Sequence, residues 1–399
     1  MSTIRPGGRL LHVVNPAAPP PPTLEPYRVL FPIGIASGLI ATGVWPLALV
    51  RGDYPAVVHR GVMMLGFEMS FVLGFLLTAM PAFTRGEKCR PWELGIAALA
   101  QLVYLAGALS GADAVAQAAT LAAVLLVSMA LVRRVAVTRA LPPEEFAFVA
   151  FALVAGITGA ALRLAAALGA PIALAPRFTE RLTSLGMVLP LVLGLGSLLV
   201  PTFAGMRDPL VIPLIAGAHE RPGRRGLYAL LMLALAASFA ADLAGRVTLA
   251  AWLRAGVAWV MVVLVWKLYR RPGLTGAPAN ALWLSGWMVA LGLFGAALAP
   301  THATALLHVV FIGGFSLLTL GIGTRVLVSH GHHPLELERA ALTPWVLSGL
   351  AFALSARLVA EWAPASAPAW LAASGAAWWL AWGSWGVRAI PGLWSTGHR

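Results

Sequence analysis

The chain of 399 residues is 59% hydrophobic and 11% charged, and its mean hydropathy is +0.83. A water-soluble surface on a chain of this length needs far more charged side chains, so the composition excludes a soluble protein and indicates a polytopic membrane protein. The net charge of +13 does not indicate a nucleic-acid partner, because the basic residues lie between apolar runs and act as topology signals. The single cysteine excludes an internal disulfide bond.

Residues 1–26 are rich in proline and contain no apolar run long enough for a signal peptide, which favours an extended, disordered cytoplasmic tail. Apolar runs then follow, each near the roughly 20 residues that cross a hydrocarbon core of about 30 Å. They cover residues 28–50, 61–83, 92–110, 113–132, 145–169, 181–203, 227–244, 247–269, 279–299, 302–325, 342–361 and 368–388. The sequence therefore predicts an all-α membrane domain of 12 transmembrane helices over residues 27–390 and a short cytoplasmic tail over residues 391–399.

The basic residues give these helices an orientation. With the N-terminus in the cytoplasm, 20 of the 28 Lys and Arg residues fall on the cytoplasmic side, five fall outside and three lie within spans. Loops rich in Lys and Arg resist translocation across the membrane. We therefore expect both termini in the cytoplasm.

Three segments of 12 residues share a pattern that opens on Gly, has Leu at the fourth position and closes on Arg. They are residues 74–85, 196–207 and 314–325, which end the second, sixth and tenth runs, so each interval between them covers four helices. Internal repeats predict repeated structural units. We expect a pseudo-threefold arrangement of three four-helix units, with chance similarity between apolar segments as the alternative.

Two histidines lie in runs that both pass from the outside to the inside, His59 at the start of the second and His308 in the tenth. Both imidazoles therefore belong to the outer half of the bilayer, where an ionisable side chain needs a partner. Two interpretations are open. Either His59 caps a helix and His308 is a hydrogen-bonded core residue, or the two imidazoles ligate one haem iron from opposite faces.

The tenth run and the segment after it resemble the NnrS family, bacterial membrane proteins associated with haem, copper and nitric oxide. The matching residues there are Leu307, His308, Gly313, Thr319, Leu320, Gly321, Thr324, Arg325, Val326, His330, Pro334 and Leu335. Further matches are His59, Met63, Gly66, residues 74–79 and Pro81 in the second run, and residues 201–203 in the sixth. Gly61 and Val62 depart from the family pattern by replacing its second His and its Glu.

The resemblance implies a bacterial inner-membrane protein of nitric-oxide metabolism, nitrosative stress or denitrification. It implies a b-type haem, copper as a further metal, and nitric oxide and an electron donor as partners. The 12-helix architecture is also similar to the catalytic subunit of haem-copper oxidases, which implies a low-spin haem between the second and tenth helices. An oxidase-type binuclear centre is not expected, because the sixth and seventh runs contain no histidine.

Three arginines, Arg163, Arg254 and Arg357, fall within spans and in the same outer half as the two histidines. A guanidinium group in lipid costs at least about 2.5 to 3.5 kcal/mol and so requires an anion. Haem propionates are suitable anions, because arginine binds carboxylates through charge-assisted and often bidentate hydrogen bonds. The alternative is that these arginines reach the interface or pair with Asp242 or Glu361.

A histidine cluster, His330, His332 and His333, follows the tenth run on the cytoplasmic side. Imidazoles at this spacing bind copper or zinc, and a solvated loop is the alternative. Glu68 in the second run either relays protons or forms a hydrogen bond to a neighbouring helix. Cys89 lies between Lys88 and Arg90, whose charges favour a thiolate, and the alternative is that a lone loop cysteine has no special role.

A second class of function fits the same residues. In a secondary transporter of twelve helices, His308, Glu68 and the embedded arginines would line a path for a solute or for protons. The threefold repeat argues against this class, because many transporters are built from two repeated halves.

Overall fold

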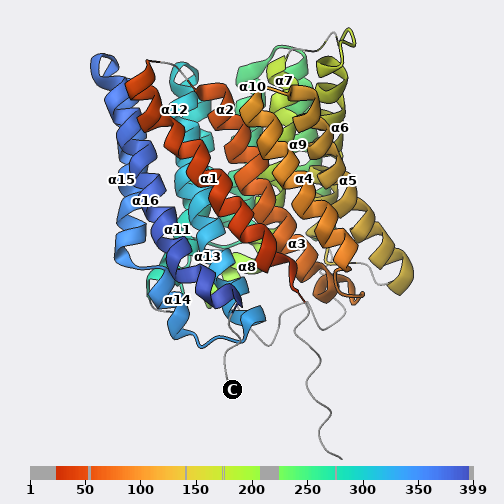
Figure 1. The fold of residues 1–399 in the computed structure, drawn as a ribbon. Helices are drawn as coiled ribbons and strands as arrows, with labels where there is room; N and C mark the ends of the chain where they lie inside the picture. The colour runs from red at the N-terminus through yellow and green to blue at the C-terminus, as the bar shows by residue number, and fades with distance from the viewer. Residues whose placement is uncertain are drawn as a thin grey trace, which may run out of the picture.

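The structure is a computed structural model that describes residues 24–52, 55–139, 142–172, 174, 176–206, 224–274 and 276–394. Every regular element in these ranges is a helix, and the helices run side by side as a bundle (Figure 1). Lipid offers no hydrogen-bond partner to the backbone, and a helix satisfies its own N–H and C=O groups. The predicted tail falls almost entirely on residues 1–23, which lie outside the described ranges.

The first half of the bundle contains α1 (Pro26–Arg51), α2 (Ala56–Gly61), the π-helical η1 (Val62–Glu68), α3 (Met69–Thr84), α4 (Pro91–Ser110), α5 (Asp113–Thr138), α6 (Phe146–Ala167), α7 (Pro176–Thr183) and α8 (Leu185–Phe203). The second half begins with α9 (Arg224–Leu243), α10 (Val247–Val260), the π-helical η3 (Met261–Val265), α11 (Ala277–Leu298), the 3-10 turn η4 (Pro300–His302) and α12 (Ala303–His308). It ends with the π-helical η5 (Val309–Ser316), α13 (Leu317–Gly331), α14 (Glu336–Ala341), α15 (Pro344–Trp362), the 3-10 turn η6 (Pro364–Ser366) and α16 (Ala367–Trp394).

Eleven helical segments in the described residues are long and apolar enough to cross a membrane, and they coincide with the first eleven predicted runs. The second of them joins α2, η1 and α3, and the tenth joins η4, α12, η5 and α13. The protein is therefore a polytopic helical membrane protein. The twelfth predicted run forms α16, which is long enough at 28 residues but is not among these eleven. Its tryptophans and Arg388 make it less apolar than the other segments.

The helix ends differ in one respect from the repeat predicted from the sequence. Arg85 ends α3 in the left-handed conformation, with φ of 53°. Arg325 lies inside α13, which continues to Gly331, and Arg207 is outside the described residues. The prediction that the third repeated segment ends its helix is therefore wrong. The extra residues remain helical because Val326, Leu327 and Val328 are buried.

Two of the eleven spans form the centre of the bundle. In both Ala56–Thr84 and Pro176–Phe203, 89% of the apolar window is buried, against 56% in Pro300–Gly331. The first and last helices close the bundle, because α1 packs against both α3 and α16 (Figure 1). A cluster of rings from Phe67, Phe71, Trp378, Trp382 and Trp385 fills this junction, with centroid distances of 4.7–6.3 Å. Large aromatic side chains of this kind contribute much of the apolar burial in a core.

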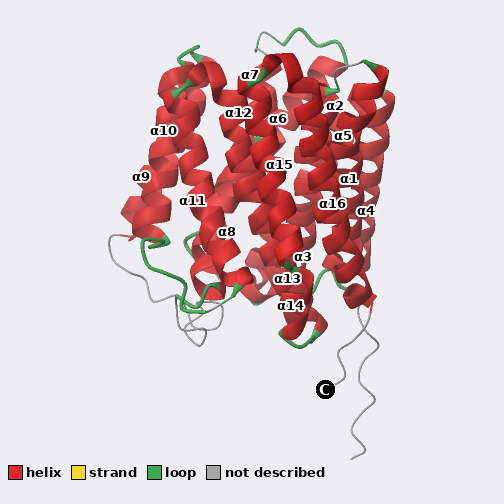
Figure 2. Cartoon of the chain, turned by 90° about the vertical axis from the view of Figure 1, so that its left-hand side faces the viewer, coloured by secondary structure: helices red, strands yellow, loops and turns green. Residues whose placement is uncertain are grey.

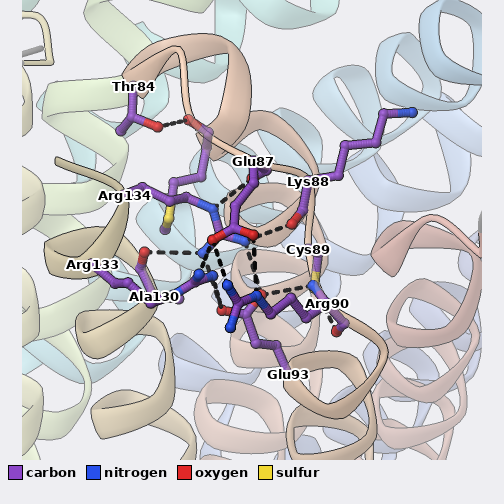
Figure 3. Close-up of polar contacts among 10 residues, drawn as sticks. Thr84, Glu87, Lys88, Cys89, Arg90, Glu93, Ala130, Arg133 and Arg134 are labelled. Carbon is purple, nitrogen blue, oxygen red and sulfur yellow. Dashed lines mark hydrogen bonds and ion pairs between the residues drawn. The ribbon is translucent and has the colours of Figure 1, made fainter. Parts of the chain in front are cut away.

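The bundle has two distinct ends. The short helices α2, α7 and α12 lie at the upper end in Figures 1 and 2, and α14 lies at the lower end. At the lower end, the loop between α3 and α4 is tied to α5 by a network of ion pairs (Figure 3). We call this network the α4–α5 clasp and define it as Glu87, Arg90, Glu93, Arg133 and Arg134.

Candidate functional site

A cavity of about 1260 Å³ lies between helices from the beginning, middle and end of the chain. The lining at its mouth includes Gly52 after α1, Arg177 of α7 and Pro364 of η6, and its deep end is lined by Glu68 of η1 and Trp378 of α16. Small-molecule sites in proteins are typically about 300–1,000 Å³. The cavity is therefore large enough for a cofactor of considerable size.

Both histidines singled out in the sequence line this cavity. His59 is in α2 and His308 is the last residue of α12, so that the fold brings together two residues separated by most of the chain. The two imidazoles and the guanidinium group of Arg357 are near enough to influence one another electrostatically. The ring of Trp45 packs edge-on against His59 at 5.4 Å, and Phe311 contacts His308 in the same way at 5.8 Å.

A backbone carbonyl fixes the tautomer of each ring. Nδ1 of His59 lies 2.9 Å from the carbonyl oxygen of Ala41, and Nδ1 of His308 lies 2.7 Å from that of Thr304. A carbonyl oxygen only accepts, so Nδ1 donates in both neutral rings and Nε2 keeps its lone pair. This arrangement is the one usually found in histidines that ligate metals, whose second nitrogen is held by an outer hydrogen bond.

Each cavity histidine is followed closely by a π-helical segment. η1 begins three residues after His59, and η5 begins directly after His308. Single π-helical turns within α-helices are rare and frequently mark functional sites, because the wider turn changes which side chains face a neighbouring helix. The two segments carry the inner lining of the cavity from the histidines to Glu68 and Phe315.

The structure separates the three span arginines. Arg357 lines the cavity, and its Nη1 is 3.7 Å from Glu361 Oε2. Arg254 is buried, forms an ion pair with Asp242 and lies over the ring of Phe239 at 4.5 Å. Neither Arg254 nor Arg163 is among the described residues that line the cavity.

Arg163 instead donates from Nη1 to the hydroxyl oxygen of Thr183 at 3.4 Å. The pairing of Arg254 with Asp242 follows the alternative that the sequence left open for the span arginines. Of the three, Arg357 alone is placed to meet a ligand in the cavity, within the part of the chain that the structure describes.

The mouth is also lined by charged residues that were not selected from the sequence. Arg60 forms a 2.9 Å ion pair with Glu180, which connects α2 to α7, and Arg181 pairs with Asp242 at 2.7 Å. Arg60, Glu180 and Arg181 all line the cavity. The signal was present in the sequence, since Arg60 directly follows His59 and the short segment before the sixth run contains both Arg and Glu.

The histidine cluster after the tenth run does not assemble into a metal site. Within the ranges that the structure describes, no group of three or more His, Cys, Asp or Glu side chains is arranged to hold a metal ion. Nε2 of His333 lies 2.6 Å from the carbonyl oxygen of Gly392, and Nδ1 of His330 lies 4.0 Å from Glu25. His332 ends α13 in the left-handed conformation. The side chain of His330 thus lies near the residue that precedes α1, and that of His333 connects the end of α13 to α16.

The basic neighbours of Cys89 do not make it a thiolate, which agrees with the alternative that this cysteine has no special role. Burial is the main reason that the pKa of this thiol is raised to about 12, and the nearby carboxylate of Glu93 adds to the effect. The flanking charges of Lys88 and Arg90 do not compensate, because Arg90 is engaged with Glu87 and Lys88 with Glu25. The thiol is therefore neutral at physiological pH.

The fold and the cavity define a class, a polytopic helical membrane protein with a deep cavity that presents two neutral imidazoles. The chain belongs to the NnrS family, since the family model described as NnrS protein matches residues 21–396. This match covers nearly the whole chain, including all helices from α1 to α16. A sequence comparison with curated proteins finds no match.

Proposed function

We propose that the protein binds haem in this cavity and acts in nitric-oxide metabolism or in the response to nitrosative stress, with His59 and His308 as the residues that would hold the iron. The observation that carries the proposal is the pair of Nδ1 hydrogen bonds to Ala41 and Thr304, which leave both Nε2 atoms available on one cavity. Membership of the NnrS family supports it.

The residues present fit a haem. Two neutral imidazoles are a common axial ligand pair, the volume exceeds that of typical small-molecule sites, and the aromatic rings of Trp45, Phe311 and Phe315 supply apolar walls. Arg357, with Arg60 and Arg177 nearer the mouth, lines the same cavity and would pair with the propionates. Bound iron would supply one-electron transfer, and it would bind a gas only where one of the two imidazoles gave up its place. The chain's own residues would orient the group and limit the access of water.

The same proposal includes an orientation. The upper end, with the cavity mouth, faces away from the cytoplasm, and the lower end, with the α4–α5 clasp, lies on the cytoplasmic side of a bacterial inner membrane. α16 crosses as the twelfth span, which returns the C-terminus to the cytoplasm, and the helices form three four-helix units. The distribution of Lys and Arg in the sequence supports this orientation.

Optical spectra of the purified protein, oxidised and reduced with dithionite, test the haem site. We expect the spectrum of a six-coordinate low-spin haem, and we expect it to be lost in both His59→Ala and His308→Ala. The control is His332→Ala, which changes a histidine outside the cavity and is expected to leave the spectrum intact. Wild-type protein that is colourless after expression with sufficient haem would contradict the proposal.

A secondary transporter is the second candidate, and the cavity itself favours it. The cavity opens at the upper end of the bundle. At its deep end, inside the span Ala56–Thr84, it contains the buried acid Glu68. Such a form suits a solute or proton path as well as a cofactor site. Nitric oxide added to the reduced protein separates the two, because it shifts the spectrum only if haem iron is present.

A further inference from the structure

Glu68 is the last residue of η1 and lies at the deep end of the cavity. It follows His59 by nine residues in the same span and therefore lies further from the mouth. The cavity therefore extends well below the two histidines. Met64 and Phe315 line it at this depth, so the carboxyl group has largely apolar surroundings.

The side chain of Glu68 has one polar partner in the described residues. Thr319 of α13 donates its hydroxyl proton to Oε2 at 3.1 Å, and only 6% of the residue is exposed. Oε1 has no partner in the described part of the chain, and because Glu68 lines the cavity this atom is left for water or a ligand. Since an unpaired carboxylate is costly to bury, the neutral acid is the resting form.

No charged side chain compensates for this burial. The charged and titratable residues that line the cavity together with Glu68 are His59, Arg60, Arg177, Glu180, Arg181, His308, Arg357 and Glu361. Arg325 lies on α13, the helix of Thr319. Arg60, Arg325 and Arg357 are paired with Glu180, Glu338 and Glu361, respectively. Among the described residues, Glu68 therefore interacts with Thr319 and with no cation.

We propose that Glu68 is the proton-exchange group of the cavity, with Thr319 as its positioning residue. In the step, the O–H bond of the acid breaks and the proton passes to a water molecule or to an oxygen atom of a ligand at the deep end. The bonding electrons remain on the carboxylate, which the Thr319 hydroxyl stabilises. A hydronium ion arriving from the mouth restores the acid and leaves water.

This assignment goes beyond the proposed function and does not depend on it, because it applies whether or not haem is bound. The π-helical geometry of η1 is a second reason for it. Glu68 ends this π-helical segment and faces α13 and the cavity, and no ion pair among the described residues holds it there.

Infrared spectroscopy of the purified protein, transferred from H₂O to D₂O, tests the proposal. The C=O stretch of a protonated carboxylic acid lies apart from the amide bands, and deuteration lowers its frequency. We expect one such exchangeable band in wild-type protein and its complete loss in Glu68→Gln. Thr319→Val should shift the band by removing the hydrogen bond, whereas Thr319→Ser should restore its position.

The matched control is Glu361→Gln, which changes a paired carboxylate on the same cavity and should leave the band unchanged. Each variant is compared with wild type in thermal unfolding, so that a misfolded variant is recognised. A band that survives in Glu68→Gln, the absence of any band in wild type, or a Glu68 band that does not exchange with D₂O would each overturn the proposal. The spectra of haem-free protein carry the same information, so the haem proposal can fail independently.

Discussion

The hydrogen bonds of His59 and His308 show how the backbone prepares a side chain for function. A neutral imidazole has one donor and one acceptor nitrogen. A carbonyl oxygen beside Nδ1 makes Nδ1 the donor and leaves Nε2 as the acceptor. The sequence could predict that both residues lie in the same half of the bundle, because both are near the start of spans with the same direction. It could not predict the partners, Ala41 and Thr304, because any residue offers a carbonyl group.

The same limit explains why the sequence did not distinguish the three arginines within spans. Sequence position alone grouped Arg163, Arg254 and Arg357, since each lies in the outer half of a span. The direction of each side chain depends on helix rotation, which turns Arg254 toward Asp242 and Arg357 toward the cavity. Apolar residues surround all three in sequence, so hydrophobic periodicity gave no signal to separate them.

The thiol of Cys89 provides a test of whether this single side chain is buried. Because the pKa of Cys89 is about 12, the reactive thiolate remains scarce as the pH rises from about 7 to about 9. We expect maleimide labelling of Cys89 in folded protein to be slow over the whole range, although its rate should rise about tenfold for each pH unit as the thiolate fraction grows. An exposed thiol from Ser110→Cys in a Cys89→Ala background should react at least about tenfold faster. Equal labelling rates for the two thiols would contradict the burial of Cys89.

Among the elements, the π-helical segments are the features that the sequence concealed. The hydrophobic pattern predicted the spans that contain η1 and η5 but treated each as a continuous α-helix. A π-helical turn uses the same residue types as an α-helical turn, so composition does not reveal it. It nevertheless determines that Glu68 faces Thr319 of the tenth span.

The α4–α5 clasp has one fully buried ion pair at its centre, between Glu93 and Arg134. The side chains of Glu93 and Arg134 are both 0% exposed and pair at 2.8 Å, and Arg134 also donates to the backbone carbonyls of Glu87 and Lys88. Figure 3 shows these groups converging on the loop between α3 and α4. The clasp therefore fixes the loop as well as the two helices.

Removal of one buried partner should destabilise the protein markedly. In Glu93→Gln the guanidinium groups of Arg133 and Arg134 lose their buried carboxylate, which we expect to cost about 3–5 kcal/mol of unfolding free energy. Glu87→Gln is the matched control, because Glu87 also pairs with Arg133 but is partly exposed, and exposed pairs contribute about 0–1 kcal/mol. Thermal unfolding in detergent measures both. Similar stability of the two variants would show that burial of the clasp is not the deciding factor.

For the molecule as a whole, composition and charge were sufficient to predict a polytopic helical bundle. The contact between α1 and α16 was not predictable, because it depends on how the spans are arranged around one another. Tryptophans such as Trp382, which fills the junction, also occur in membrane proteins as interfacial anchors. Tryptophan serves both purposes, and only its position in the bundle separates them.

The orientation can be measured with reporter fusions. With the cavity mouth away from the cytoplasm, a reporter fused after His219 should be active as a cytoplasmic protein, and one fused after Pro300 should be active as an exported protein. A fusion after the C-terminal residue Arg399 should resemble the first, since α16 is expected to cross as the twelfth span. Export of the fusion after Arg399 would mean that α16 does not cross.

The charges at the cavity mouth have a consequence for the rate at which different molecules reach the interior. The lining there includes Arg60, Arg177, Arg181 and Arg357 against the two carboxylates of Glu180 and Glu361. An excess of positive charge around a low-dielectric opening concentrates small anions and repels cations, and added salt weakens both effects. The positive charge at the mouth neither attracts nor repels uncharged gases. An anionic molecule should therefore arrive more slowly as ionic strength rises, whereas nitric oxide should arrive at a rate that salt does not alter.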